Sequence, residues 1–125
     1  PESFKPYAEA ILNADGLVIV TPEYNGSMPG ILKYFIDLLK FPESFEHKPV
    51  AFIGLGGRFG ALRPVEHLMQ VFSYRNAHLF PERVFISEIK KQMSANGELA
   101  NDDIRSRLEG QSAHFVDYVR HLRKI

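Results

Sequence analysis

The chain has 125 residues and a mass of 14.3 kDa, which suits one domain with a hydrophobic core and is too short for two ordinary domains. Hydrophobic residues make up 45% and charged residues 24%, which excludes a disordered chain. The 15 basic residues balance 15 acidic ones, which argues against a protein that binds nucleic acid through its overall charge. Cysteine is absent, which excludes disulfides, thiol catalysis and cysteine-ligated metal sites.

The first predicted elements are a short helix and a buried strand. The helix begins at Pro6, where the missing N–H costs nothing because the first turn of a helix has no acceptor for it. Residues 13–16 end the helix, and residues 17–20 form a continuous apolar run without alternation of polar and apolar side chains. Such a run predicts a strand covered on both faces, as in a parallel sheet.

A turn-rich loop at residues 21–30 leads to the second predicted helix. From Ile31 to Leu39 the apolar residues recur at helical spacing, and charged residues such as Asp37 lie opposite them. Residues 50–55 form another apolar run, which predicts a second buried strand, and a glycine-rich loop follows it.

The second half of the chain repeats this pattern. Residues 62–72 predict a helix that tolerates Pro64 in its first turn, and residues 84–86 predict a third strand. Asn101 is a favourable N-cap for the last helix because its side chain can accept a hydrogen bond from the first turn. The apolar face of that helix is expected at Ile104, Leu108, Phe115, Val119 and Leu122.

The alternation of helices and strands predicts the fold class. It indicates right-handed β–α–β units in an open parallel α/β sheet with helices on both faces, in three layers. Three strands are few for this class, and the chain opens on a helix that leads into a strand. We therefore expect residues 1–125 to form a single domain from which a preceding strand–helix–strand portion is missing.

Two loops are candidates for binding because ligands of open α/β sheets lie beyond the carboxyl ends of the strands. Residues 21–30 contain two prolines, two glycines and the aromatic Tyr24, and this loop suits a flat heteroaromatic ligand. A tight turn with a surface tyrosine explains the same composition. Residues 54–60 lack the spacing of dinucleotide and P-loop motifs, so they indicate a close approach to the backbone or an ordinary turn.

The remaining reactive residues form no recognisable catalytic or metal-binding set. His114 and His121 lie seven residues apart on the last predicted helix, without the partner that would complete a metal site. Ser27 lacks the Gly-x-Ser-x-Gly frame of a hydrolase nucleophile. We therefore predict neither a catalytic side chain nor a metal site.

The string from Thr21 to Lys33, Thr-Pro-Glu-Tyr-Asn-Gly-Ser-Met-Pro-Gly-Ile-Leu-Lys, resembles the signature loop of the NAD(P)H-dependent FMN reductase family, the flavodoxin-like quinone, azo-dye and chromate reductases. The resemblance continues through residues 14–16, 57–63 and 96–99 and covers essentially the whole chain. It implies a flavodoxin-like fold in which the three strands are the third, fourth and fifth. Residues 1–125 would then be the C-terminal two-thirds of the family domain, without its phosphate-binding loop.

The resemblance also implies a cofactor and a site. FMN would be bound, NADPH or NADH would donate a hydride to it, and a quinone-like or other small molecule would accept it. The cofactor supplies this chemistry, so no side chain need act as acid or base. The residues implied to bind the flavin are Pro22, Glu23, Tyr24, Asn25, Gly26, Ser27, Gly56, Gly57, Arg58 and Phe59.

Two other hypotheses stay open beside the reductase. A flavodoxin-type electron carrier would bind FMN without reductase activity, but such carriers are usually strongly acidic and this chain is neutral. A non-catalytic remnant of the fold would bind no flavin.

The expected partners are a small-molecule electron acceptor and further copies of the chain. Tyr34, Phe41 and Tyr74 lie off the main apolar stripes of the second and third helices, and with the resemblance they predict a homodimer or homotetramer. No apolar run approaches the roughly 20 residues of a membrane span, and no stretch resembles a signal peptide. We expect a cytoplasmic protein with neither nucleic acid nor membrane as a partner.

Overall fold

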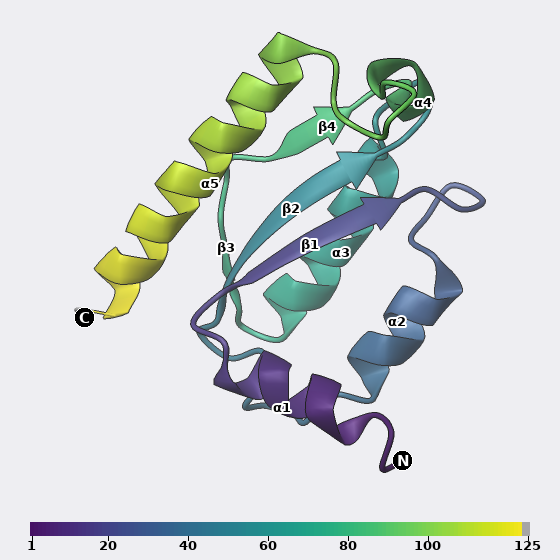
Figure 1. Cartoon of the computed structure of the whole chain (residues 1–125). Coiled ribbons are helices and arrows are strands. Elements are labelled where there is room, and N and C mark those ends of the chain that lie inside the picture. The colour runs from purple at the N-terminus through teal and green to yellow at the C-terminus, as the bar shows by residue number, and fades with distance from the viewer. Residues whose placement is uncertain (124–125) are drawn as a thin grey trace.

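The computed structural model describes residues 1–123 and contains a parallel sheet with helices on both faces (Figure 1). Its elements are α1 (Lys5–Asn13), β1 (Leu17–Pro22), α2 (Gly30–Asp37), β2 (Pro49–Leu55), α3 (Leu62–Tyr74), β3 (His78–Leu79), β4 (Val84–Ile86), α4 (Ile89–Gln92) and α5 (Asp102–Arg123). Within residues 1–123, no helix combines the length and the apolar character that a membrane crossing requires.

The strand β2 is the centre of the sheet. β1 pairs with it in parallel, from Leu17 opposite Val50 to Pro22 opposite Leu55. β4 pairs with the other edge of β2, also in parallel, over Ile53 to Leu55. The predicted parallel sheet is therefore confirmed, and the three strands that the sequence predicts lie side by side in their order along the chain. The strand β3 was not predicted, because it has only two residues and pairs with only the first two residues of β2.

Both faces of β2 are buried against helices. Val50 and Phe52 point to one face and pack in a cluster with Val65 and Phe72 of α3. Ala51 lies on the opposite face and packs with Phe115 of α5. The helices α2 and α3 therefore cover one face and α5 covers part of the other, which confirms the expected three layers (Figure 1).

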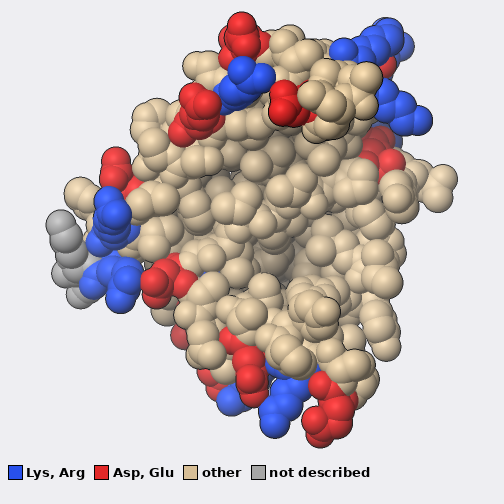
Figure 2. Space-filling model, viewed as in Figure 1, with Lys and Arg blue, Asp and Glu red and all other residues tan. Residues whose placement is uncertain are grey.

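The strand β1 is covered on one face only within residues 1–123. Leu17 and Ile19 pack against the α2–α3 side, whereas Val18 is 53% exposed and Val20 is 50% exposed. Val20 borders an apolar hollow of about 860 Å³ that α5 closes on its far side. Figure 2 shows this face, with charged side chains at its periphery and a hollowed, uncharged centre. The prediction that residues 17–20 are covered on both faces is thus wrong for the described residues.

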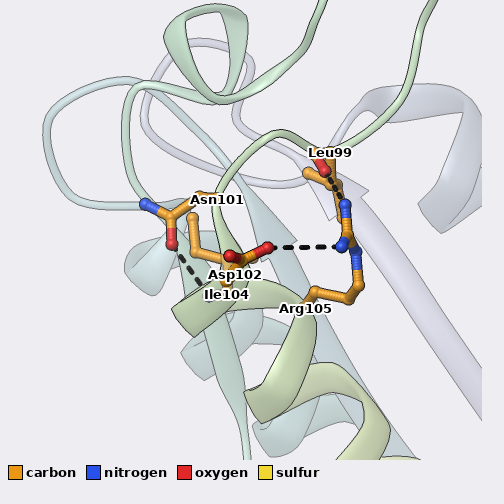
Figure 3. A network of polar contacts seen from close by, with 5 residues as sticks. All are labelled: Leu99, Asn101, Asp102, Ile104 and Arg105. Carbon is orange, nitrogen blue, oxygen red and sulfur yellow. Dashed lines mark hydrogen bonds and ion pairs between the residues drawn. The ribbon is translucent and has the colours of Figure 1, made fainter.

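The N-terminus of α5 is capped as predicted. The Oδ1 atom of Asn101 accepts a hydrogen bond of 3.1 Å from the backbone N–H of Ile104 (Figure 3). Arg105, one turn into the helix, donates to the carboxylate of Asp102 at 3.3 Å and to the backbone carbonyl of Leu99. These contacts join the start of α5 to the segment that precedes it.

Gln111 of α5 completes the hydrogen bonding of β2. β3 pairs with residues 49–50 and β4 with residues 53–55, so Phe52 faces a gap between the two strands. The side-chain amide of Gln111 donates to the carbonyl of Phe52 at 3.0 Å and to that of Glu82 at 2.9 Å. Gln111 is 2% exposed, so these bonds lie in the interior, where an unpaired carbonyl is costly.

Replacing Gln111 by Leu should therefore destabilise the fold. The change leaves two carbonyls without their donor, and we expect the free energy of unfolding to fall by about 2 kcal/mol. Urea denaturation measures this loss, and the same substitution at Gln70, which is exposed on α3, serves as the control. Equal losses at the two positions would contradict the assigned role of Gln111.

Candidate functional site

Three loops meet at the carboxyl edge of the sheet. β1, β2 and β4 run in parallel, so the segments that follow them emerge on the same side. The last residues of the strands and the first loop residues line a hollow of about 240 Å³. Its lining is Pro22, Glu23, Leu55, Gly56, Gly57, Glu88, Ile89 and Lys90. The two loops that the sequence singled out are thus neighbours, as expected.

The glycine loop folds back tightly over the end of β2. A Cβ atom on Gly54 would lie 2.2 Å from the carbonyl oxygen of Gly60, and one on Gly56 would lie 2.3 Å from the nitrogen of Ala61. Both distances are far shorter than a normal contact, so only glycine fits at these two positions. Gly57 differs, because a Cβ atom there would meet nothing within 4 Å.

Hydrogen bonds join the glycine loop to the segment after β4. The N–H of Gly56 donates to the carbonyl of Ile86 at 3.0 Å, and its carbonyl accepts from Ile89 at 3.0 Å. The carbonyl of Gly57 accepts from the N–H of Glu88 at 2.7 Å. The sequence analysis did not single out Glu88, Ile89 and Lys90. These residues follow the carboxyl end of the strand Val84–Ile86, which is where ligands of open α/β sheets bind, so the same argument would have found them.

The backbone N–H of Gly57 is an open donor at this hollow. Among the described residues it has no hydrogen-bond acceptor, and neither has the N–H of Arg58. No protein atom fills the space beside the Cα of Gly57. A flat group with acceptor atoms along its edge can therefore approach this backbone closely.

The first loop forms a tight turn over residues 24–27. Asn25 and Gly26 have φ angles of 52° and 78°, and Tyr24 and Ser27 exchange backbone hydrogen bonds of 2.9 and 3.1 Å. These are the features of a type I′ turn, for which Asn-Gly is the favoured pair. The ring of Tyr24 is largely exposed.

This turn lies against α3. The hydroxyl of Ser27 is 2.7 Å from Nδ1 of His67, and Nη1 of Arg63 is 3.1 Å from the position that a Cβ atom on Gly26 would occupy. Neither Arg63 nor His67 was singled out from the sequence. Sequence patterns such as helical periodicity are local, so they do not predict a contact between residues 40 positions apart.

A second hollow of about 400 Å³ lies beside the first. It is lined by Glu23, Phe59, Leu62, Arg63 and Glu66. Glu23 borders both hollows, and the guanidinium of Arg58 is 5.5 Å from the centre of the exposed Phe59 ring. The structure therefore places Pro22, Glu23, Gly56 and Gly57 around the first hollow and Phe59 at the second.

Charges of both signs lie around the two hollows: Glu23 borders both, Glu88 and Lys90 border the first, and Arg63 and Glu66 border the second. Glu66 pairs with Arg83 at 2.9 Å, whereas Arg58, Arg63 and Lys90 form no ion pair among residues 1–123. Three carboxylates and two cations therefore line the hollows, so this edge carries no excess of positive charge. In the same part of the chain, no three His, Asp or Glu side chains gather closely enough to hold a metal ion.

Comparisons with known proteins agree with this geometry. A family model described as NADPH-dependent FMN reductase matches residues 1–92. An NAD(P)H-dependent FMN reductase of Pseudomonas aeruginosa is 37% identical over 98% of this chain and 69% of its own length. A 2-hydroxy-1,4-benzoquinone reductase of a Burkholderia species is 34% identical over 98% of this chain and 70% of its own. The solved structure of FerB, a flavoenzyme NAD(P)H:(acceptor) oxidoreductase of Paracoccus denitrificans, superposes with a TM-score of 0.79 at 26% identity, covering 97% of this chain and 69% of FerB.

The two adjacent glycines should respond differently to alanine. Gly56→Ala drives a methyl group into the backbone at Ala61, and we expect a loss of about 1–3 kcal/mol in the free energy of unfolding. Gly57→Ala meets open space, so the free energy of unfolding should stay within about 0.5 kcal/mol of the parent. Urea denaturation of both variants tests this, and a similar response at the two positions would contradict the loop geometry.

Proposed function

This chain belongs to the NADPH-dependent FMN reductase family, and we propose that it holds the flavin in the hollow at the carboxyl edge of β1, β2 and β4. The family match confirms the resemblance that residues 21–33 carry and the expectation of an FMN-dependent NAD(P)H oxidoreductase. The FerB structure confirms the flavodoxin-like fold. The electron carrier and the non-catalytic remnant are therefore set aside.

The open backbone of Gly57 is the observation that supports this placement most directly. Its N–H would donate to an acceptor atom on the edge of the flavin ring, and Pro22 and Glu23 would border the ring from the loop after β1. When bound, FMN supplies the capacity to take a hydride from NAD(P)H and pass it on. The role of the chain is to orient the ring and to leave part of it accessible. Lys90, which borders the hollow, would place a positive charge near the ring.

The ten residues implied by the resemblance do not all have the same part in this proposal. Pro22, Glu23, Gly56 and Gly57 would contact the ring directly. Tyr24, Asn25, Gly26 and Ser27 form the turn that follows and would border the ring from that side. Arg58 and Phe59 would form the rim toward the second hollow.

A small quinone-like molecule is the proposed electron acceptor. One relative is named for the reduction of 2-hydroxy-1,4-benzoquinone. The exposed ring of Phe59 would stack on a flat quinone ring, and the guanidinium of Arg63 would donate to its carbonyl oxygens. A cytoplasmic location stays a prediction of the sequence, which cell fractionation would test.

Oxidation of NAD(P)H in the presence of FMN and a benzoquinone tests the function, and Gly57→Val tests the site. The valine side chain fills the space that the ring edge would occupy, so FMN should bind at least about tenfold more weakly, a loss of about 1.4 kcal/mol. Quenching of FMN fluorescence measures the affinity. Gly110→Val on α5, where a Cβ atom also meets nothing within 4 Å, is the control. Equal FMN affinities of the two variants would exclude this site.

We further propose that copies of the chain associate through α2 and α3. Tyr34 is 63% exposed, Phe41 is 58% exposed and Tyr74 is 77% exposed. Phe41 and Tyr74 line a groove of about 430 Å³ between these helices, and Tyr34 is adjacent in sequence to Lys33, which also lines it. The guanidinium of Arg75 lies 4.0 Å from the centre of the Phe41 ring. The groove carries both signs of charge, with Lys33 and Asp37, which pair with each other at 3.0 Å, on α2 and Arg75 at the end of α3. In a twofold dimer, Arg75 of one copy would face Asp37 of the other.

Introducing negative charges on this surface should dissociate the assembly. The double variant Tyr34→Glu and Tyr74→Glu places carboxylates in the proposed contact, so light scattering should report a monomer where the parent gives a dimer or tetramer. Tyr7→Glu changes an equally exposed tyrosine on α1 and should leave the mass unchanged. A monomeric parent at micromolar concentration would refute the proposed association.

A further inference from the structure

The turn at residues 24–27 has a fixed shape, but its own hydrogen bonds do not fix its orientation. Tyr24 and Ser27 bond to each other, and a turn held by this pair alone is marginally stable, so it opens and reorients unless a contact outside it holds it in place. Among residues 1–123, one hydrogen bond joins residues 23–28 to any residue outside that segment, and it links Ser27 to His67 at 2.7 Å. The orientation of the turn therefore depends on this side-chain pair.

His67 is held rigidly by the helix that carries it. Its neighbours on α3, Val65 and Leu68, are fully buried and pack in the same cluster as Phe52 of β2. The imidazole itself is half-buried. The packing of α3 therefore fixes the position of His67 relative to β2. The hydrogen bond from His67 to Ser27 then fixes the position of the turn relative to α3.

Two further contacts support the same arrangement. Arg63 precedes His67 by four residues, so both side chains lie on one face of α3, and the Arg63 guanidinium lies beside Gly26. On the other side of Ser27, Met28 packs against the core cluster beneath α2 and α3. Ser27 lies between these apolar and steric contacts and supplies the directional bond, which fixes the angle of the turn.

We propose that His67 is a positioning residue of the flavin site. Through Ser27 it holds the turn, and with it Glu23 and Tyr24, at the distance from the glycine loop that the flavin ring needs. This inference rests on the proposed function only for the identity of the ligand, because the hydrogen bond and its effect on the turn belong to the chain alone. His67 makes no contact with the reacting atoms and is not a catalytic residue.

The first test needs no flavin. Ser27→Ala and His67→Phe each remove one partner of the bond, and His67→Phe keeps a ring of similar shape. Hydrogen exchange of the Tyr24 and Ser27 amides should become about tenfold faster in both variants. Ser73→Ala removes an exposed hydroxyl from α3 and is the matched control, with no change expected. Unchanged exchange in Ser27→Ala would overturn the proposal, even if His67→Phe failed to fold.

The second test measures flavin binding by the full protein. Each single variant should bind FMN about fivefold to tenfold more weakly and shift the visible absorption of the bound flavin. The double variant should bind no more weakly than either single one, because one bond is lost in all three. His67→Asn places an amide near the position of Nδ1 and should recover most of the affinity.

The outcomes separate the positioning role from the proposed function. Additive losses, or affinity and absorption equal to those of the parent, would overturn the role of His67. Faster exchange in the two variants together with no FMN binding by any form, the parent included, would leave the turn contact standing and refute the flavin site. A fall in thermal stability without faster exchange in the turn would assign His67 a structural role only.

Discussion

The central position of β2 is the constraint on which the rest of the structure depends. This strand has parallel neighbours on both edges and helices on both faces, so Val50, Ala51 and Phe52 are all buried. The chain that leaves its end must turn sharply to reach α3 in the layer below. Gly54 and Gly56 make that turn possible because the backbone of residues 60–61 returns to within contact distance of them. The hollow at the sheet edge forms because the glycine loop folds back over the end of β2.

Much of the fold could be predicted from the sequence, because continuous apolar runs and helical periodicity are local signals. Residues 17–20 and 50–55 were predicted as strands on that basis, and Asn101 as a helix cap. The same signal overstated the burial of β1, since an apolar run does not show whether a helix is present to cover it. The two-residue β3 was missed because so short a strand has no periodicity. Of the candidate site, the loops were predicted, but the contact between Ser27 and His67 was not, because it forms only when α3 has packed on β2.

The candidate site consists largely of main-chain groups, and this explains why no catalytic set was visible in the sequence. Gly56 and Gly57 contribute hydrogen-bonding groups and open space, and the loop after β4 holds them through its own backbone. Side chains mainly hold the loops in place, as His67 does through Ser27, or carry a charge at the edge of the site, as Arg58 does beside Phe59. A site of this kind stays functional when many side chains change, provided that the backbone path is kept. It also leaves the chemistry to the cofactor, in keeping with the reductase family.

The amide of Gln111 has a consequence for the order in which the molecule is made. Synthesis on the ribosome proceeds from the N-terminus, so β2 emerges well before the helix whose glutamine serves the carbonyl of Phe52. Until residue 111 has left the exit tunnel, the buried carbonyl of Phe52 in the middle of the sheet has no side-chain donor. A nascent chain that ends before α5 should therefore remain a substrate for chaperones, and commitment to the native state should come late in translation, when α5 docks.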